Sequence, residues 1–408
     1  MLLPQCMQLQ TVDDKIASFI SKKFRTSRSF STMKTYQTAL NKFTEFLRVQ
    51  YNLELDHLLR MIHLKEKDPI TVLDDFYSFL SNYQRPSRTG YSNRTIHLYV
   101  VAVKEFLRSC GCRIYNEDIK QQFRLPKKNR IDEDGLTREI LVRLLHNSPA
   151  KLQTAVLMTT SSGMRIGELV QLKTSDIDFT IPTTIHVRAE TTKTREARIV
   201  HISNEATNSL KDYLVRTFGW TKDENTDRFI FLQTYEERLG KLRALLERSK
   251  DEEKPGIKKR IDELEKEYSG LNAEQKFNKA VLSAKNVLEM MLRDIIKKVP
   301  ELSIRSANGR YLVHFHACRS YFKTQVTDAH ESDYAEAMMG HSSIKLTYYR
   351  QNAKARAETY LKVEPHLVIS DFSQVQKNIE SLEQRLKEAE IQLAMAKQYQ
   401  ETRQNFKQ

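Results

Sequence analysis

Apolar residues recur every three or four positions through residues 11–124, a pattern that predicts amphipathic helices. In the segment around residues 30–47 the apolar face consists of Met33, Tyr36, Leu40, Phe43 and Leu47. In the segment 92–109 it consists of Ile96, Tyr99, Val103 and Phe106, with Ser92 or Asn93 as the expected N-cap. A further helix is expected between them, beginning at Pro69, because proline is favoured in the first turn of a helix. These segments predict a small helical domain over residues 11–124.

The pattern becomes mixed after Leu136. Residues 136–149 and 150–163 have helical periodicity, and a helix is expected again at 205–218. Between them, apolar residues alternate with polar ones at Ile185, Val187 and Ala189, and again at Val200 and Ile202. Alternation on both sides of a polar turn predicts an antiparallel β-hairpin. We therefore expect a mainly α-helical chain with a small antiparallel β-sheet, in which residues 137–370 form an α+β domain.

Two segments have coiled-coil spacing. Residues 235–275 predict an antiparallel helical hairpin with a turn at Pro255 and Gly256, and its apolar positions are Leu239, Leu242, Leu246, Ile257, Ile261, Leu264, Tyr268 and Leu271. Residues 371–408 carry a heptad series, namely Val375, Ile379, Leu382, Leu386, Ala389, Leu393 and Ala396. The C-terminal heptads could pair with a second copy, pair with the internal hairpin, or dock on their own domain.

Residues 125–136 contain a proline, several basic residues and no periodicity, which predicts a basic linker between the two domains. Such a linker is either a solvated hinge or a segment that lies along a phosphate backbone. The candidate DNA-binding residues are Lys127, Lys128 and Arg130 in the linker and Lys34, Lys42, Arg94 and Lys104 in the helical domain.

The 408 residues have a formal net charge of +14 and a pI of about 9.4. A charge of this sign favours a polyanionic partner. No apolar run approaches the roughly 20 residues of a membrane span, and residues 1–15 are too polar for a signal peptide, so nucleic acid is the expected partner. The chain contains neither a glycine-rich phosphate loop nor a carboxylate cluster suited to Mg²⁺. The spacing of Cys6, Cys110, Cys112 and Cys318 does not predict a zinc site, and we expect no metal or cofactor.

Several polar residues lie in otherwise apolar surroundings. Arg165 follows Gly163 in a turn between two helices, and Glu168 is placed to hold it. His316 and Arg319 share one helix face and are expected to be partly buried. His341 follows Gly340, and Lys193 is expected at the tip of the β-hairpin. Each pattern alone is also compatible with a purely structural role.

The order of these residues resembles the tyrosine recombinase (phage integrase) family. The segments SGMRIGEL, HACR and MMGHSSI match the family's motifs, and YYRQNAKARAETYLKVEPHLVIS is most similar to archaeal members. The resemblance implies that residues 11–124 are a core-binding domain and 137–370 the catalytic domain. It also implies that Arg165 and Arg319 bind the scissile phosphate, Lys193 is the general acid, and His316 and His341 assist.

A tyrosine would form a 3′-phosphotyrosyl bond, without metal or ATP. Tyr348 and Tyr349 stand seven and eight residues after His341, where the family commonly has nine. This spacing favours Tyr349, whereas alignment on the YYR…YLK segment favours Tyr348, which we predict to be the nucleophile.

The resemblance implies a site-specific recombinase that acts on double-stranded DNA as a tetramer on two sites, in the cytoplasm and associated with the nucleoid. Two other functions use the same residues. A type IB topoisomerase would relax supercoils as a monomer, and an architectural DNA-binding protein would bind DNA without cutting it. Covalent attachment to DNA separates the last function from the other two.

Overall fold

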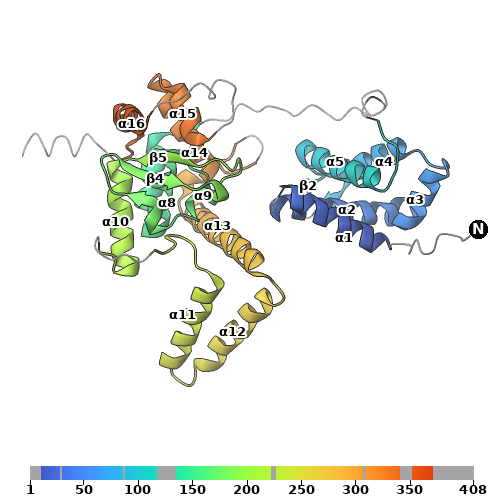
Figure 1. Ribbon diagram of the computed structural model, residues 1–408, viewed down its shortest axis with the longest axis horizontal. Helices are drawn as coiled ribbons and strands as arrows, with labels where there is room; N and C mark the ends of the chain where they lie inside the picture. The colour runs from blue at the N-terminus through green and yellow to red at the C-terminus, as the bar shows by residue number, and fades with distance from the viewer. Residues whose placement is uncertain are drawn as a thin grey trace, which may run out of the picture. The chain divides into compact units, whose positions relative to one another are not determined.

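Figure 1 shows the computed structural model, which describes residues 11–27, 30–85, 88–115, 117, 135–221, 227–306, 309–340 and 352–370. The chain divides into two compact units, Met1–Arg130 and Ile131–Gln408, and each has its own hydrophobic core. Most of the predicted linker and all of the predicted C-terminal heptads lie outside the described residues. The same holds for six candidate residues, namely Lys127, Lys128, Arg130, His341, Tyr348 and Tyr349.

The N-terminal unit is a helical bundle, as predicted. Its elements are α1 (Val12–Ser27), α2 (Phe30–Phe46), a π-helical turn (Leu47–Tyr51), α3 (Leu55–His63), α4 (Pro69–Asn82), β1 (Gln84–Arg85), β2 (Arg88–Thr89) and α5 (Asn93–Ser109). Helix α4 begins at Pro69, with Asp68 as its N-cap, and Ser92 caps α5. The predicted apolar faces of α2 and α5 meet in the core, where Phe43 and Phe106 are fully buried.

The C-terminal unit combines helices with a three-stranded antiparallel sheet in the order β3–β4–β5. The strands are β3 (Ile177–Asp178), β4 (Thr183–Val187) and β5 (Arg198–Ile202), and Ile185 pairs with Val200. Besides the hairpin described below, its helices are α7 (Arg138–His146), α8 (Ala150–Ser162), α9 (Ile166–Leu169), α10 (Asn204–Phe218), α13 (Ala273–Lys298), α14 (Phe315–Asp328), α15 (Ser332–Met339) and α16 (Ala353–Leu367). The mainly helical fold with a small antiparallel sheet is thus confirmed. Ala189, predicted as a strand position, lies instead in a 3₁₀ turn after β4.

Helix α8 lies at the centre of this unit, where it packs against α10, α14 and β5. Every residue from Thr154 to Ser162 is buried, including four consecutive hydroxyl side chains at its C-terminal end. These hydroxyls donate hydrogen bonds to carbonyls one turn earlier, as Ser161 does to Leu157 at 2.7 Å. The helix therefore buries polar residues without leaving their hydroxyls unpaired, and it provides a fixed base for the turn that follows.

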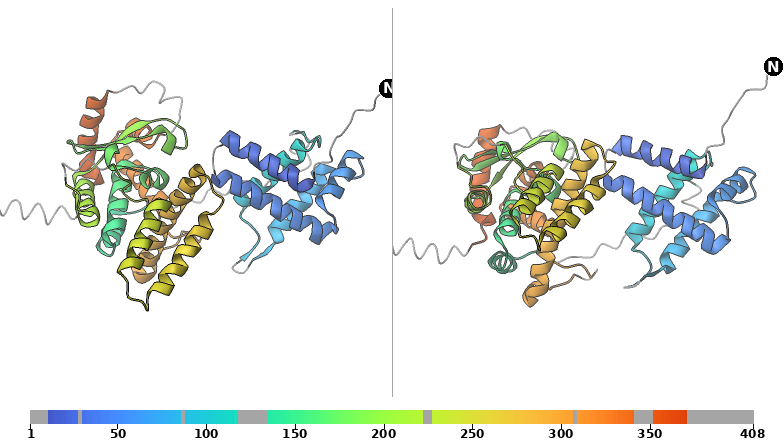
Figure 2. Two further views of the ribbon diagram at one scale, coloured as in Figure 1. Left: turned by 60° about the horizontal axis from the view of Figure 1, so that its bottom comes forward. Right: turned by 90° about the horizontal axis from the view of Figure 1, so that it is seen from below.

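The predicted helical hairpin consists of α11 (Tyr235–Arg248) and α12 (Lys254–Tyr268), which lie side by side and antiparallel (Figures 1 and 2). The apolar positions Ile257, Ile261, Leu264 and Tyr268 are buried, as their spacing predicted. The turn does not lie at Pro255 and Gly256 as predicted. Pro255 lies instead in the first turn of α12, where the backbone N–H has no partner in the helix, so proline, which lacks this group, is favoured there. Within the described residues, no helix is long and apolar enough to cross a membrane.

Candidate active site

The turn between α8 and α9 positions Arg165. Gly163 ends α8 in the left-handed conformation, with φ of +67°. Two residues later, the backbone N–H of Arg165 donates to Glu168 Oε2 at 2.9 Å and so begins α9. The guanidinium of Arg165 also donates from Nη1 to Glu168 Oε1 at 3.1 Å. The predicted pair of Arg165 and Glu168 is therefore present, with the backbone and the side chain of the arginine held by one carboxylate.

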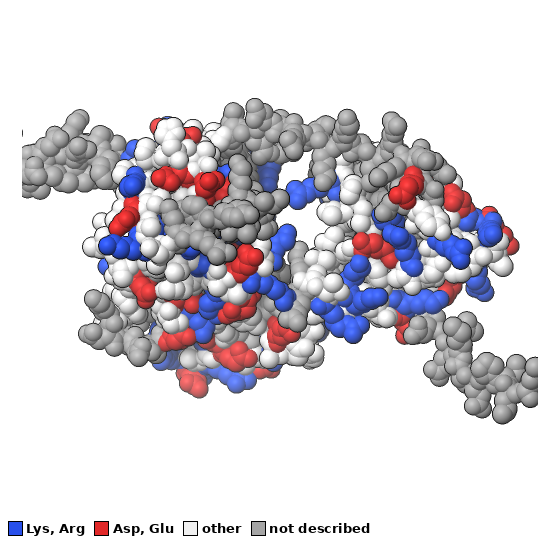
Figure 3. All heavy atoms as spheres, turned by 45° about the horizontal axis from the view of Figure 1, so that its top comes forward, with Lys and Arg blue, Asp and Glu red and all other residues white. Residues whose placement is uncertain are grey.

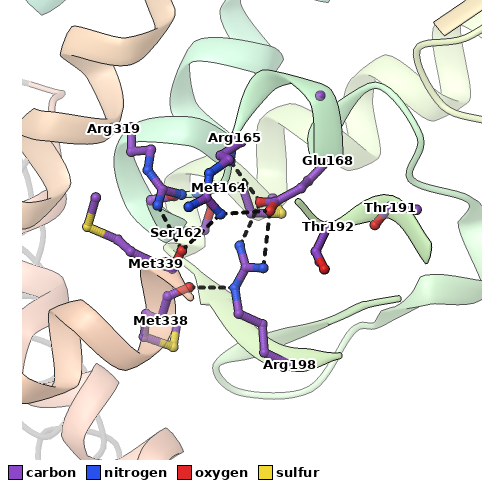
Figure 4. A network of polar contacts seen from close by, with 12 residues as sticks. Ser162, Met164, Arg165, Glu168, Thr191, Thr192, Arg198, Arg319, Met338 and Met339 are labelled. Atoms are coloured by element: carbon purple, nitrogen blue, oxygen red, sulfur yellow. Dashed lines mark hydrogen bonds and ion pairs between the residues drawn. The ribbon is translucent and has the colours of Figure 1, made fainter. Parts of the chain in front are cut away.

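Glu168 is a buried carboxylate whose side chain is only 2% exposed. Burial by itself would raise its pKa. Hydrogen bonds and charge from Arg198, together with the contacts from Arg165, outweigh this effect and hold the pKa below its usual range. Glu168 is therefore ionised at neutral pH and acts as the anionic centre of an arginine cluster (Figure 4).

Arg319 reaches the same place from α14. It is 2% exposed, and it donates from Nη1 to the carbonyl of Gly163 and from Nη2 to the carbonyl of Met339 at 2.8 Å. Arg165 Nη1 approaches that Met339 carbonyl at 3.3 Å, so two predicted arginines converge on one backbone oxygen (Figure 4). Burial, and then the charge of Arg165, lower the pKa of Arg319 to about 10.

Arg198, the first residue of β5, completes the cluster and was not among the predicted site residues. It binds Glu168 with two hydrogen bonds, at 2.6 Å from Nη2 and 3.2 Å from Nη1, and it donates from Nε to the Met338 carbonyl at 2.7 Å. In the sequence it ends the polar stretch TTKTREAR, which reads as a solvated turn. The one signal that could have singled it out was its position directly before the buried strand residues of β5.

The other described candidates lie nearby but outside the cluster. Lys193 is exposed in the β4–β5 connection, one residue after Thr192, which Figure 4 places on the Glu168 side of the cluster. His316 and Arg319 were both expected to be partly buried; instead, Arg319 is fully buried and His316 is exposed at the start of α14. His316 and Ile166, the neighbour of Arg165, line one cavity of about 260 Å³.

The described DNA-binding candidates differ in their surroundings. Lys34 on α2 and Arg94 on α5 are exposed, and Figure 3 shows many Lys and Arg side chains on the visible face of the N-terminal unit. Lys42 is different, because its ammonium bonds to Glu45 at 2.6 Å and to the Tyr83 hydroxyl at 2.7 Å. Burial alone would lower the pKa of Lys42, but these two hydrogen bonds raise it.

The arrangement is suited to binding an anion. Arg165, Arg198 and Arg319 bring three positive charges to the single negative charge of Glu168. Within the described part of the chain, the hydrogen bonds of the Arg165 guanidinium use Nη1 alone, and its side chain is 30% exposed. The rest of its fork is therefore available to a phosphate-like ligand. Among the described residues, no group of three or more His, Cys, Asp and Glu side chains is placed to hold a metal ion.

Comparisons with known proteins agree with the family resemblance seen in the sequence motifs. Residues 134–271 match the model of the phage integrase family. The chain is 30% identical over 158 residues to a tyrosine recombinase XerA of Thermococcus onnurineus, an alignment that covers 38% of this chain and 51% of that protein. It is 26% identical over 211 residues to a tyrosine recombinase of Thermosipho africanus, covering 49% and 67%. The resemblance to tyrosine recombinases is confirmed.

A solved structure of a tyrosine recombinase has a fold similar to that of this chain. A lambda integrase tetramer bound to a Holliday junction matches with a TM-score of 0.50 and 13% identity, over 84% of this chain and 80% of that one. At this identity the likeness establishes the fold alone. The chain spans about half the length or less of its two Thermococcus relatives, 51% and 32%. Activity therefore has to be argued from the residues of the site.

Proposed function

We propose that this protein is a site-specific DNA recombinase, which cuts and rejoins strands through a 3′-phosphotyrosyl intermediate without metal or ATP. The observation that carries the proposal is the arginine cluster, in which Glu168 holds Arg165 and backbone carbonyls hold Arg319, beside an excess of positive charge. A phosphodiester undergoing transfer accumulates negative charge on its non-bridging oxygens. Fixed guanidinium donors stabilise that charge without having to reorganise during the reaction.

The chemical step needs a nucleophile and an acid. In the proposed reaction the Tyr348 oxygen attacks phosphorus, the bond to the 5′-oxygen breaks, and Lys193 donates a proton to that oxygen. His316 and His341 bond the phosphate and assist removal of the tyrosine proton. The phosphotyrosyl ester retains the energy of the broken bond, so the reverse attack by a 5′-hydroxyl rejoins a strand. Tyr349 is the alternative nucleophile.

Duplex DNA is the proposed substrate, and the nucleoid in the cytoplasm the proposed place of action. The helical unit, with Lys34, Lys42, Arg94 and Lys104, would contact the duplex as a core-binding domain, and Lys127, Lys128 and Arg130 would extend this contact. The lambda integrase relative forms a tetramer on a Holliday junction, and we propose the same assembly here. The heptads in residues 371–408 would support self-association.

Covalent trapping tests this function. The protein is incubated in EDTA with nicked genomic duplex, denatured, and examined for a DNA-shifted band. We expect a band from the wild type, its loss in Tyr348→Phe, and its retention in Tyr349→Phe. Arg165→Lys and Arg319→Lys should each slow formation of the adduct on the order of 10²–10³-fold, because each removes a preorganised phosphate donor.

Each other outcome changes a defined part of the proposal. Loss of the band only in Tyr349→Phe would keep the reaction and move the nucleophile by one residue. Relaxation of plasmids by the wild type without sequence preference would favour a type IB topoisomerase. The absence of a band on DNA that the wild type demonstrably binds would favour an architectural DNA-binding protein.

A further inference from the structure

The C-terminal end of α15 is the point at which the arginine cluster meets the chain leading to residue 341. The last carbonyls of a helix have no partner within the helix and carry partial negative charge. Here the Met338 carbonyl accepts from Arg198, and the Met339 carbonyl accepts from Arg319 and Arg165 (Figure 4). Three cations from three separate elements therefore hold the last turn of α15.

Arg198 differs from Arg165 because its whole guanidinium is occupied. Nη1 and Nη2 bind the two oxygens of Glu168, and Nε binds the Met338 carbonyl. Its side chain is 8% exposed, against 30% for Arg165. All three nitrogens thus have partners within the protein, which leaves Arg198 poorly placed to be a phosphate ligand itself.

The chain turns directly over Arg198 as it leaves α15. Gly340 has a φ of +63°, and a Cβ built on it would lie 3.2 Å from Arg198 Nη1. A side chain at position 340 would therefore be strained by its backbone conformation and would press on the guanidinium. Arg198 consequently holds the end of α15 through the Met338 carbonyl, and it leaves no room for a side chain at the glycine that follows.

We propose that Arg198 is a positioning residue for the strand-cleavage reaction. It fixes the carboxylate that holds Arg165, and it fixes the end of α15 from which His341 follows. Loss of its forked geometry would displace Arg165 and the end of α15 while leaving DNA contacts elsewhere intact. This inference rests on the proposed function, since it concerns the rate at which the tyrosine reacts with DNA.

The test is Arg198→Lys, which keeps the charge but cannot bind both Glu168 oxygens and the Met338 carbonyl together. Arg188→Lys is the matched control. Arg188 also pairs with a buried carboxylate, Asp176 at 3.1 Å, and donates to a backbone carbonyl, Gln171 at 2.7 Å. Three quantities are measured for each variant: the dissociation constant for duplex DNA, the single-turnover rate of adduct formation on nicked genomic duplex, and the urea midpoint from Trp220 fluorescence.

We expect Arg198→Lys to slow adduct formation on the order of 10²-fold, the effect of displacing a reacting group by about 1 Å. DNA affinity should stay within about twofold of wild type. In an Arg165→Lys background the same change should slow adduct formation by a smaller factor than in the wild-type background, because Arg198 acts partly through Arg165. Arg188→Lys should cleave at the wild-type rate even where it lowers the urea midpoint equally. A difference in cleavage rate between Arg198→Lys and Arg188→Lys therefore distinguishes a positioning role of Arg198 in catalysis from a contribution to stability alone.

Two results would overturn the inference alone: a wild-type rate in Arg198→Lys, or an equal loss of rate in Arg188→Lys. If the wild type itself forms no adduct, the proposed function fails and the inference fails with it. If Arg198→Lys does not fold, Gly340→Ala takes its place, because its methyl group would press on Arg198. Gly219→Ala, at another left-handed glycine with nothing within 4 Å, is then the control, and equal cleavage rates for the two would refute the inference.

Discussion

At the scale of single residues, His201 on β5 shows how burial sets a protonation state. It is 2% exposed, its Nδ1 lies 3.3 Å from the Thr184 hydroxyl, and its ring centroid is 5.4 Å from that of Tyr360 on α16. Burial lowers its pKa to about 4, with a smaller contribution from the charge of Arg356, against a backbone hydrogen bond to Thr183 that raises it. The imidazole is therefore neutral at pH 7.

This low pKa predicts an acid-sensitive fold. The usual pKa is 6.5, so below that value the unfolded chain binds a proton that the folded chain does not, and stability falls with pH down to about 4. Between pH 7 and pH 5, this histidine lowers the free energy of unfolding by about 2 kcal/mol. Urea unfolding is followed by Trp220 fluorescence, because this single tryptophan lies in the C-terminal unit.

The comparison is between wild type and His201→Gln at both pH values. The free energy of unfolding of the wild type, minus that of the variant, should fall by about 2 kcal/mol between pH 7 and pH 5. His186→Gln, which removes an exposed imidazole from β4, controls for the loss of a histidine as such. A difference between wild type and His201→Gln that stays constant with pH would contradict the assignment.

The site residues also show what local sequence can and cannot predict. The pair of Arg165 and Glu168 was predictable because three residues on one turn bring the two side chains together. Arg198 was not, because its partners Glu168 and Met338 are 30 and 140 residues away in the chain. His316 was predicted to be partly buried from its apolar neighbours, yet it lies exposed at the start of α14. Burial depends on the packing of distant elements, which local composition does not encode.

At the scale of elements, the turn between α8 and α9 depends on close packing against α14. A Cβ at Gly163 would lie 2.5 Å from Phe322 Cδ1 and 3.1 Å from Met339 Cγ. Gly219 ends α10 with nearly the same φ, +64° against +67°, but nothing lies within 4 Å of its Cβ position. The two glycines therefore separate the cost of backbone strain from the cost of a steric clash.

Gly219→Ala should lower the free energy of unfolding by about 1 kcal/mol, the cost of a left-handed alanine. Gly163→Ala should lower it by a further ~1–3 kcal/mol, because the methyl group overpacks the contact with α14. It should also slow adduct formation, since the Gly163 carbonyl accepts a hydrogen bond from Arg319. Urea titrations and single-turnover cleavage of both variants give the answer, and equal unfolding costs would exclude a clash at Gly163.

Elements with strong periodicity were predictable, and short ones were not. The N-cap Ser92, the start of α4 at Pro69 and the buried face of α12 follow from local rules of capping and spacing. Strand β3 was missed because two residues are too few to show alternation, and they form a strand only by pairing with β4. A two-residue strand is defined by its partner rather than by its own sequence.

At the scale of the whole molecule, the net charge of +14 predicts that DNA binding weakens as salt rises. Neutralising a phosphate releases counterions, so the logarithm of the binding constant falls with the logarithm of salt by about 0.9 for each phosphate contact. A lysine contributes to this slope only if its charge is available to DNA. Exposed Lys34 and Arg94 meet that condition, whereas Lys42 is already paired with Glu45 at 2.6 Å.

The slope therefore tests which of the basic residues contact DNA. Lys34→Gln and Arg94→Gln should each reduce its magnitude by about 0.9, with little change in the urea midpoint, because both side chains are exposed. Lys42→Gln should leave the slope nearly unchanged and lower stability instead, since it removes the partner of Glu45 and Tyr83. Fluorescence anisotropy with a labelled duplex at several salt concentrations measures the slope for all three variants. Urea unfolding followed by far-UV circular dichroism measures their stability, because Trp220 lies in the other unit. A loss of slope in Lys42→Gln equal to that in Lys34→Gln would mean that the pair with Glu45 opens on DNA and frees the ammonium for a phosphate.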